Sequence, residues 1–156
     1  MSGGDGELGR IAAERACERL LVEYAWLIDS GEASKVADLV TAQATWTGAD
    51  GGGMAGRDEI RRAFEGRERL TRRLSRHVVT NVRVDVADDD HASATAYLVQ
   101  YRHDAADGPA VAPTAMEHPK FVGDYHLTFL RTEEGWRIDS LRFELAFLRQ
   151  RRGDGA

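Results

Sequence analysis

The sequence has almost nothing that would cross-link the chain or hold it in a membrane. Cys17 is the only cysteine, so the chain can form neither an internal disulfide nor a cysteine-based zinc site. It lies in an apolar helical stretch, which favours a small core residue over a nucleophile. No run of about 18 apolar residues occurs, and residues 1–6 lack the basic and apolar segments of a secretory signal. We therefore expect a cytoplasmic protein with no membrane partner.

Proline is scarce and confined to one region. The chain has three prolines, and all of them lie between Asp104 and Pro119. Because proline removes a backbone donor from a sheet, this segment cannot be a regular central strand. We interpret it as a long loop between two strands, and loops of this length often act as pocket lids.

Basic residues are fewer than acidic ones, and the formal net charge of −5 would repel phosphate backbones. Nucleic acid is therefore not an expected partner. One segment differs from this average: between Gly66 and Arg76, Glu68 is the only acid among five arginines, which are Arg67, Arg69, Arg72, Arg73 and Arg76. The run is either a solvated helix end or a basic groove for an anionic substrate or a carrier protein.

The length of 156 residues suits one domain whose core needs no disulfide or metal. Hydrophobic residues at 42% and charged residues at 30% are ordinary for a globular protein and argue against a disordered chain. We predict a single domain over residues 8–148. Residues 1–7 and 149–156 are predicted to be flexible termini.

Three helices are predicted in the first half of the chain. Apolar or small residues recur at spacings of three and four from Ile11 to Ile28, which marks the buried face of a long helix. Asp29-Ser30-Gly31 ends this helix, and a shorter one follows around residues 36–40. Residues 56–65 form the third helix, with two acids in the first turn, where the helix dipole favours them.

The remainder of the chain has the alternating pattern of strands. From Val78 onward, the valines at alternate positions and Thr80 fall on one side, and three aspartates at 88–90 supply the turn to the next strand. The last two strands form a hairpin, and a brief strand followed by a turn at 50–53 precedes the third helix. The predicted strands are residues 44–47, 78–86, 92–102, 121–131 and 136–148.

Helices first and antiparallel strands afterwards indicate an α+β fold, not the alternation that builds a parallel sheet. A sheet of this length twists and curls, and its concave side must be covered. We predict a cone-shaped domain in which three N-terminal helices pack on a curved, mostly antiparallel sheet and enclose one apolar pocket.

Three polar residues are candidates for chemistry in this pocket. Tyr24 lies on the apolar face of the first helix, and Asp29 at the helix end can turn toward the same cavity. His77 opens a long strand, opposite the valines and on the same side as Asn81. A buried tyrosine can donate to an enolate oxygen, an aspartate can orient a histidine, and a histidine moves protons near neutral pH. The structural alternatives are a core tyrosine, a helix-end cap and a structural histidine.

The other histidines are less suited to catalysis. His91 sits in a turn and His118 in the proline loop, so both are expected to be exposed. His126 is expected to face solvent or a dimer partner while Tyr125 faces the core, although a strand bulge would reverse this assignment. No close metal-ligand spacing occurs, and no metal site is predicted.

Four short motifs in this sequence resemble those of a known family. The motifs are residues 24–29, Gly56-Arg57-Asp58-Glu59-Ile60, His77 to Asn81, and Gly135-Trp136-Arg137-Ile138 with Arg142 beyond it. Over about residues 8–148 the chain resembles the SnoaL-like members of the nuclear transport factor two-like (NTF2-like) superfamily. This superfamily includes scytalone dehydratase, ketosteroid isomerase, polyketide cyclases and bile-acid dehydratase. The resemblance implies a cystatin-like, cone-shaped barrel around one pocket, a shell that many relatives keep without the activity.

The resemblance also implies site residues. In the dehydratases of this group, a tyrosine and an aspartate of the first helix region act with a histidine at the start of a strand. Bile-acid dehydratase has a further acid on the next strand, where this chain has Gln100 or Tyr101, and neither His103 nor His126 securely matches the second histidine of scytalone dehydratase. The implied catalytic set is Tyr24, Asp29, His77 and Arg142, and the predicted substrate-binding set is Trp46, Asn81, Tyr97, Gln100, Tyr101 and Tyr125.

Two functions from different classes remain open. The first is a cofactor-independent lyase or isomerase acting on a hydrophobic oxygenated small molecule, such as a polyketide, terpenoid or steroid-like ring. His77 would abstract a proton next to a carbonyl, Asp29 would orient His77, and Tyr24 would donate to the enolate oxygen. The second is a non-catalytic small-molecule-binding protein or the small subunit of a ring-hydroxylating dioxygenase. A homodimer, or a higher homo-oligomer, is expected for the enzyme.

Overall fold

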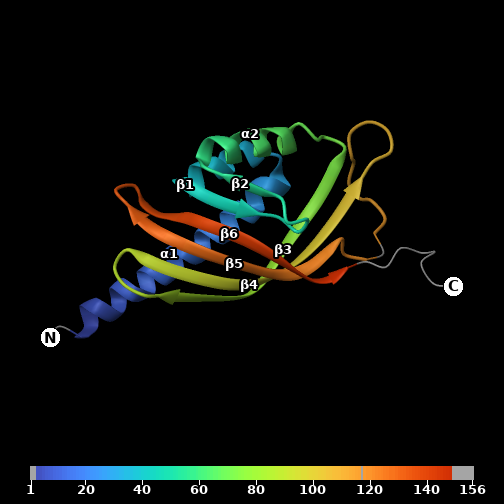
Figure 1. Cartoon of the computed structure of the whole chain (residues 1–156). Helices are drawn as coiled ribbons and strands as arrows, with labels where there is room; N and C mark the ends of the chain where they lie inside the picture. The colour runs from blue at the N-terminus through green and yellow to red at the C-terminus, as the bar shows by residue number, and fades with distance from the viewer. Residues whose placement is uncertain (1–2, 117, 149–156) are drawn as a thin grey trace.

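The computed structural model describes residues 3–116 and 118–148, and the predicted α+β order is confirmed there (Figure 1). Two α-helices and one 3-10 helix pack on a six-stranded sheet. No helix in these ranges is long and apolar enough to cross a membrane. Residues 3–7 of the N-terminal segment expected to be flexible are helical, whereas residues 1 and 2 and the segment 149–156 lie outside the described residues.

The first helix, α1, spans Gly3–Ser30 and crosses behind the strands in Figure 1. Its inward face is almost completely buried and consists of Cys17, Leu21, Tyr24 and Ile28. Burial raises the pKa of the Cys17 thiol to about 11, which confirms its assignment as a core residue and not a thiolate nucleophile. Gly31 follows the helix with φ of +83°, a left-handed conformation that glycine adopts without a Cβ clash.

The next two helices are short. The second, η1, is a 3-10 helix over Ala33–Leu39. The third, α2, spans Arg57–Glu68, carries Asp58 and Glu59 in its first turn as predicted, and buries Ile60 and Phe64. Both pack against each other, and α2 also contacts β1.

The sheet has the strand order β2-β1-β6-β5-β4-β3. All neighbours are antiparallel except β1 and β6, which run parallel. The bounds are Val40–Thr47 for β1, Gly53–Ala55 for β2, Arg73–Val86 for β3, His91–Asp104 for β4, Phe121–Thr132 for β5 and Gly135–Leu148 for β6.

The sheet differs from the expectation in its closure and in the bounds of its strands. β3 begins at Arg73, five residues earlier than predicted, so His77 lies inside this strand and does not open it. Within the described residues, β2 and β3 each pair on one side only, so the curved sheet is open and not a closed barrel. In addition, β1 begins four residues earlier than predicted, and β2 was not predicted at all. Its three residues are too few to show an alternating pattern.

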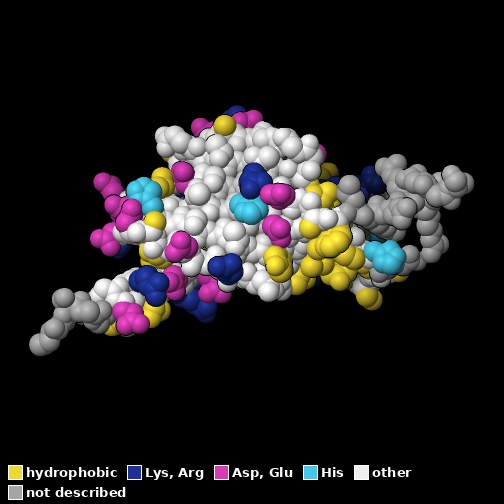
Figure 2. All heavy atoms as spheres, turned by 60° about the horizontal axis from the view of Figure 1, so that its bottom comes forward, with side chains coloured by type: hydrophobic (Ala, Val, Ile, Leu, Met, Phe, Trp, Pro, Cys, Tyr) yellow, Lys and Arg dark blue, Asp and Glu magenta, His cyan; other side chains and the backbone are white. Residues whose placement is uncertain are grey.

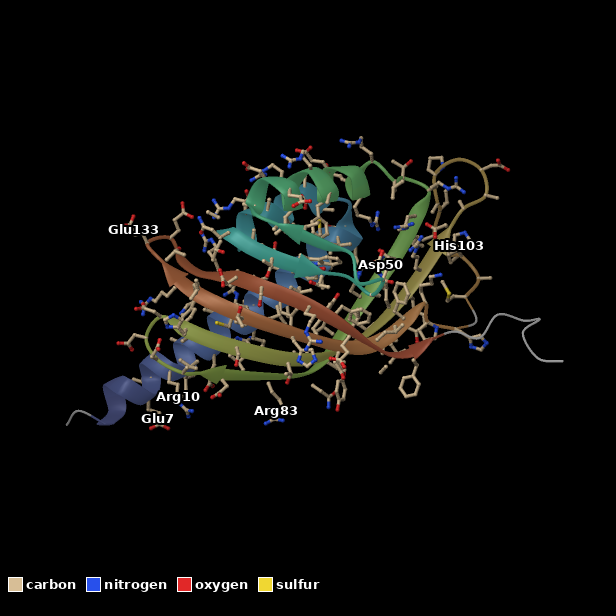
Figure 3. All side chains as sticks on the ribbon, viewed as in Figure 1. Glu7, Arg10, Asp50, Arg83, His103 and Glu133 are labelled. Atoms are coloured by element: carbon tan, nitrogen blue, oxygen red, sulfur yellow. The ribbon has the colours of Figure 1, made fainter. Side chains whose placement is uncertain are left out.

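A bulge in β3 changes the face on which the predicted valine stripe lies. The pairing with β4 shifts between Thr80 and Arg83, and Asn81 takes a positive φ of 53° there. An extra residue reverses the alternation of a strand, so Val78 is exposed before the bulge while Val82 packs on the core after it. Arg83 points away from the helices (Figure 3). The prediction that the valines and Thr80 share one side is therefore wrong.

The side of the sheet away from the helices is exposed and partly apolar. Figure 2 shows hydrophobic side chains gathered on part of this face. In β4, Tyr97 and Tyr101 are 55% and 40% exposed, whereas Ala96 and Leu98 are buried. The alternation in β4 thus separates the core from the outer surface.

Gly123 in β5 is a position where the backbones of neighbouring strands come unusually close. A Cβ at this position would overlap the carbonyl oxygen of Glu144 and lie 2.8 Å from Cζ of Phe143. Gly123→Ala should therefore lower the free energy of unfolding by about 1–3 kcal/mol, the usual range for overpacking. Urea unfolding followed by circular dichroism measures this change.

The matched control is Gly9→Ala. Gly9 lies in α1, where an added Cβ would meet no atom within 4 Å, and alanine is the better helix former by about 0.8–1 kcal/mol. This substitution should stabilise the protein slightly. Equal stability of the Gly123→Ala variant and the wild type would contradict the close approach of β5 and β6.

Candidate functional site

A cavity of about 250 Å³ lies between α1, α2 and the inner face of the sheet. Most of its wall is apolar and is formed by Ile28, Ala49, Met54, Ala63, Phe64, Leu98, Phe121 and Phe143. The polar part of the wall consists of Tyr24, Trp46, Arg67, Arg73, His77, Gln100 and Tyr125. An apolar cavity with a few converging polar groups is the usual form of a small-molecule site.

Asp29 joins the end of α1 to β3. Its Oδ1 accepts hydrogen bonds from Ser75 Oγ at 2.8 Å and from Nδ1 of His77 at 2.7 Å, and its Oδ2 accepts from the backbone N–H of His77 at 2.5 Å. The side chains of His77 and Asp29 are only 7% and 11% exposed. The helix end therefore places a buried carboxylate directly behind the histidine.

The charge of Asp29 determines the tautomer of His77. Burial opposes ionisation of Asp29, but its interactions with His77 and Ser75 outweigh burial and lower the pKa of the carboxyl below its ordinary value. Because Asp29 is then a carboxylate near neutral pH, Nδ1 of His77 donates in their hydrogen bond, and in the neutral form of the imidazole Nε2 has the lone pair. Asp29 borders an outer hollow beside Trp26, whereas His77 also lines the cavity. Asp29 is therefore placed to position His77.

Gln100 forms a hydrogen bond with the second ring nitrogen of His77. Nε2 of the Gln100 amide lies 2.8 Å from Nε2 of His77, and β3–β4 pairing sets the two residues opposite each other. The amide N–H donates to the lone pair, which is consistent with a neutral imidazole. Oε1 of Gln100 is buried without a hydrogen-bond partner among the described residues. If the amide group rotated, Oε1 could accept a hydrogen bond from a protonated Nε2.

Tyr24 is a buried hydroxyl in the cavity wall. The indole N–H of Trp46 donates to the Tyr24 oxygen at 3.0 Å, and the rings of Phe64 and Tyr125 pack against Tyr24 edge-on, each with its centroid 6.1 Å away. Burial raises the pKa of Tyr24 to about 12, although hydrogen bonds from Trp46 and Tyr125 oppose this. Tyr24 is therefore a neutral hydroxyl able to donate.

The arginine run contains exposed residues as well as residues that line the cavity. Arg69, Arg72 and Arg76 are exposed, as expected of a solvated helix end. Arg67 and Arg73 are partly buried and line the cavity. The sequence alone did not separate these two groups.

Six predicted site residues come together. Five of them line the cavity, and they are Tyr24, His77, Trp46, Gln100 and Tyr125. Asp29 lies behind His77. The predicted convergence of the first helix and the long strand therefore occurs, while the catalytic roles remain predictions.

Four predicted site residues lie elsewhere. Arg142 is exposed and paired with Glu144 at 2.7 Å on the outer side of β6, so its predicted position near the pocket is wrong. Tyr97 and Tyr101 alternate with the inward residues of β4 and face outward. Asn81 is exposed because it forms the β3 bulge, and therefore it does not share the inner side with His77.

The remaining histidines do not line the cavity. His91 is exposed beside Asp88, His118 is exposed, and His126 faces outward near Glu144 while Tyr125 is buried, as expected. His103 lies in the last part of β4 (Figure 3). Among residues 3–116 and 118–148, no three His, Cys, Asp or Glu side chains are close enough to hold a metal ion.

Several cavity residues were not predicted as site residues, and Arg67 is the most informative of them. It follows Ile60 and Phe64 at spacings of seven and three, which places it on the buried face of α2. This spacing was a signal in the sequence. Phe121 alternates with Tyr125, so its inward side could also be inferred from the sequence.

Solved structures with the same fold come from Novosphingobium aromaticivorans. A proposed scytalone dehydratase of strain DSM 12444 has a TM-score of 0.74 and 17% identity, covering 89% of this chain and 87% of that one. An NTF2-like protein with a cystatin-like fold has a TM-score of 0.75 and 21% identity, and the match covers 97% of this chain and 89% of that one. A proposed aromatic ring hydroxylase has a TM-score of 0.72 and 25% identity, and the match covers 88% of this chain and 91% of that one.

A comparison with curated proteins finds no match. The family model of the SnoaL-like domain matches residues 9–142, which is most of the chain. The matched range contains the buried Asp29–His77 pair and the cavity residues Tyr24 and Gln100. This chain therefore belongs to the SnoaL-like domain family.

Proposed function

We propose that the protein is a cofactor-independent lyase or isomerase acting on a hydrophobic oxygenated small molecule. The observation that carries the proposal is His77, whose Nδ1 is held by the buried Asp29 carboxylate and whose ring lines the cavity. This arrangement suits general-base catalysis. The apolar wall suits a substrate ring, and one structure with the same fold is described as a proposed scytalone dehydratase.

The proposed first step removes a proton from the carbon next to a substrate carbonyl. Nε2 of His77 takes the proton, and the electron pair of the broken C–H bond moves toward the carbonyl to form an enolate. The resulting imidazolium is stabilised by Asp29, 2.7 Å from Nδ1. Gln100 must give up its contact with Nε2 as the substrate approaches. Its Oε1, which has no partner among the described residues, can then accept a hydrogen bond from the new N–H of His77.

Tyr24 is proposed to stabilise the enolate oxygen. Its oxygen already accepts a hydrogen bond from Trp46, so its own proton can be donated to the substrate. Such a bond strengthens as negative charge develops and lowers the barrier. If a β-hydroxyl leaves and takes the proton from His77, the products are an alkene and water. If the proton instead returns to a more distant carbon, the double bond moves.

The second candidate is the small subunit of a ring-hydroxylating enzyme or another non-catalytic binding protein. One similar structure is described as a proposed aromatic ring hydroxylase. This likeness supports the ring-hydroxylating subunit as the second candidate. In such a protein, Asp29 and His77 would only join α1 to β3. The apolar cavity would then bind a ligand or remain unused.

The two candidates predict different assemblies. A cytoplasmic enzyme is expected to purify alone as a homodimer, which size-exclusion chromatography with light scattering would detect as twice the mass of the chain. Stable co-purification with a larger iron-containing subunit would contradict the enzyme proposal and support the alternative.

The proton-abstraction step can be tested without knowing the natural substrate. A panel of cyclic β-hydroxyketones and β,γ-unsaturated ketones is incubated with the protein in D2O, and loss of the proton next to the carbonyl is followed by NMR. His77→Gln should slow exchange by about 10²–10⁴-fold because the base is removed. Asp29→Asn should slow it by at least about tenfold, because the imidazolium loses its stabilising charge.

The matched control for this experiment is His126→Gln, which removes a histidine from the outer side of the sheet. It should leave exchange unchanged. If the His77→Gln and Asp29→Asn variants, folded by circular dichroism, exchange the proton within a few-fold of the wild type, the assigned roles are wrong.

Tyr24→Phe removes only the hydroxyl and keeps the packing of the ring. Exchange should fall by about 10²-fold, the effect expected for the loss of one oxyanion donor. Tyr97→Phe, which removes an exposed hydroxyl on the outer face, is the control. A rate for Tyr24→Phe equal to that of this control would exclude the proposed donor.

A further inference from the structure

Arg67 brings a positive charge into a mostly apolar wall. It lies in the last turn of α2, is partly buried and lines the cavity that His77 also lines. Its Nη2 donates to Ser75 Oγ at 3.0 Å. No carboxylate lies within ion-pair distance of Arg67 among the described residues. A partly buried cation paired only with a neutral hydroxyl is costly unless a ligand completes it.

No neighbouring carboxylate contacts Arg67 directly; the nearest link to an acid runs through Ser75 to Asp29. Arg73, which also lines the cavity, and Arg102 each bind Asp104 at 2.7 Å. Arg73 and Arg102 therefore share one carboxylate at this side of the cavity, and Asp104 forms no ion pair with Arg67. Asp29 is the other nearby acid, and its oxygens already accept from Ser75 and His77. Burial and the charge of Arg73 lower the pKa of Arg67, although the charges of Asp29 and Asp104 oppose this shift, and a guanidinium remains charged in proteins.

We propose that the ligand of this cavity is a small hydrophobic acid whose carboxylate binds Arg67, with Arg73 adding to the positive potential. This inference rests on the proposed function in assuming that the cavity holds a small molecule, and it narrows the substrate class to carboxylates. A carboxylate matches the planar guanidinium through two parallel hydrogen bonds. The cavity volume of about 250 Å³ leaves room for one or two rings beside the apolar wall.

A purely structural role for Arg67 makes a different prediction. The chain of hydrogen bonds from Arg67 through Ser75 to Asp29 also helps to hold the helix end. If this were its only role, substitution of Arg67 would weaken the binding of neutral and acidic ligands to the same extent. Ligand pairs that differ only in the charged group therefore separate the two roles.

The experiment compares three acids with their alcohols: benzoate with benzyl alcohol, cinnamate with cinnamyl alcohol, and 2-naphthoate with 2-naphthalenemethanol. Binding at low ionic strength is followed by NMR through the indole N–H of Trp46, which lines the cavity. At least one acid should bind about tenfold more tightly than its alcohol, as expected for a charge-assisted hydrogen bond. Added salt should reduce this preference.

Variants of two arginines at the same helix end provide the controls. Arg67→Gln should reduce the preference for the acid to less than about threefold, and Arg67→Lys should retain part of it, because the charge remains without the paired geometry. Arg69→Gln, which removes an exposed arginine outside the cavity wall, should leave the preference unchanged. The proposal is overturned if no acid is preferred over its alcohol by the wild type, or if the preference survives in Arg67→Gln.

This result is independent of the catalytic test. If no ketone of the panel is exchanged but the Arg67-dependent preference is present, the proposed chemistry is wrong and the acid site stands. If exchange depends on His77 but no acid is preferred, the proposed chemistry stands and the acid site is wrong.

Discussion

The fold and the candidate site depend on the same buried carboxylate. Asp29 stands at the end of α1 and accepts three hydrogen bonds from Ser75 and His77 of β3. A buried carboxylate is costly unless its oxygens are satisfied, so the helix end and the strand favour one relative position. The same bonds determine which nitrogen of His77 carries a proton. Packing of α1 and the chemical state of His77 therefore cannot change independently.

The shape of the cavity depends on interruptions in the sheet. The bulge at Asn81 lets Val79 and Val82 both pack toward the core, although a regular strand would send them to opposite faces. Gly123 allows β5 to approach β6 where a side chain would collide with Glu144 and Phe143. Bulges and glycine kinks are the usual means of curving a sheet. The concave face that receives the helices follows from these local irregularities.

The sequence indicates residues on regular elements better than residues at irregular ones. The helical spacing around Tyr24 and the helix end at Asp29 were visible, and both residues take part in the site. Asn81 was misplaced because alternation was extended through a bulge that leaves no pattern. Arg142 was placed at the pocket by family resemblance alone, and the strand register directs it outward to Glu144. Pairing between distant strands decides such positions, and one sequence does not contain that information.

The charged groups around the cavity also constrain what can react there. Transfer of a proton to His77 would create an imidazolium beside Asp29 and an enolate facing Tyr24, so that each new charge has a partner already in place. The apolar wall strengthens both interactions because Coulomb energies rise as the effective dielectric constant falls. Arg67 is linked to Asp29 through Ser75 and keeps its positive charge throughout. In the proposed acid site, the apolar surroundings would make it costly to bury a carboxylate, and the positive charge of Arg67 would be the interaction that offsets this cost.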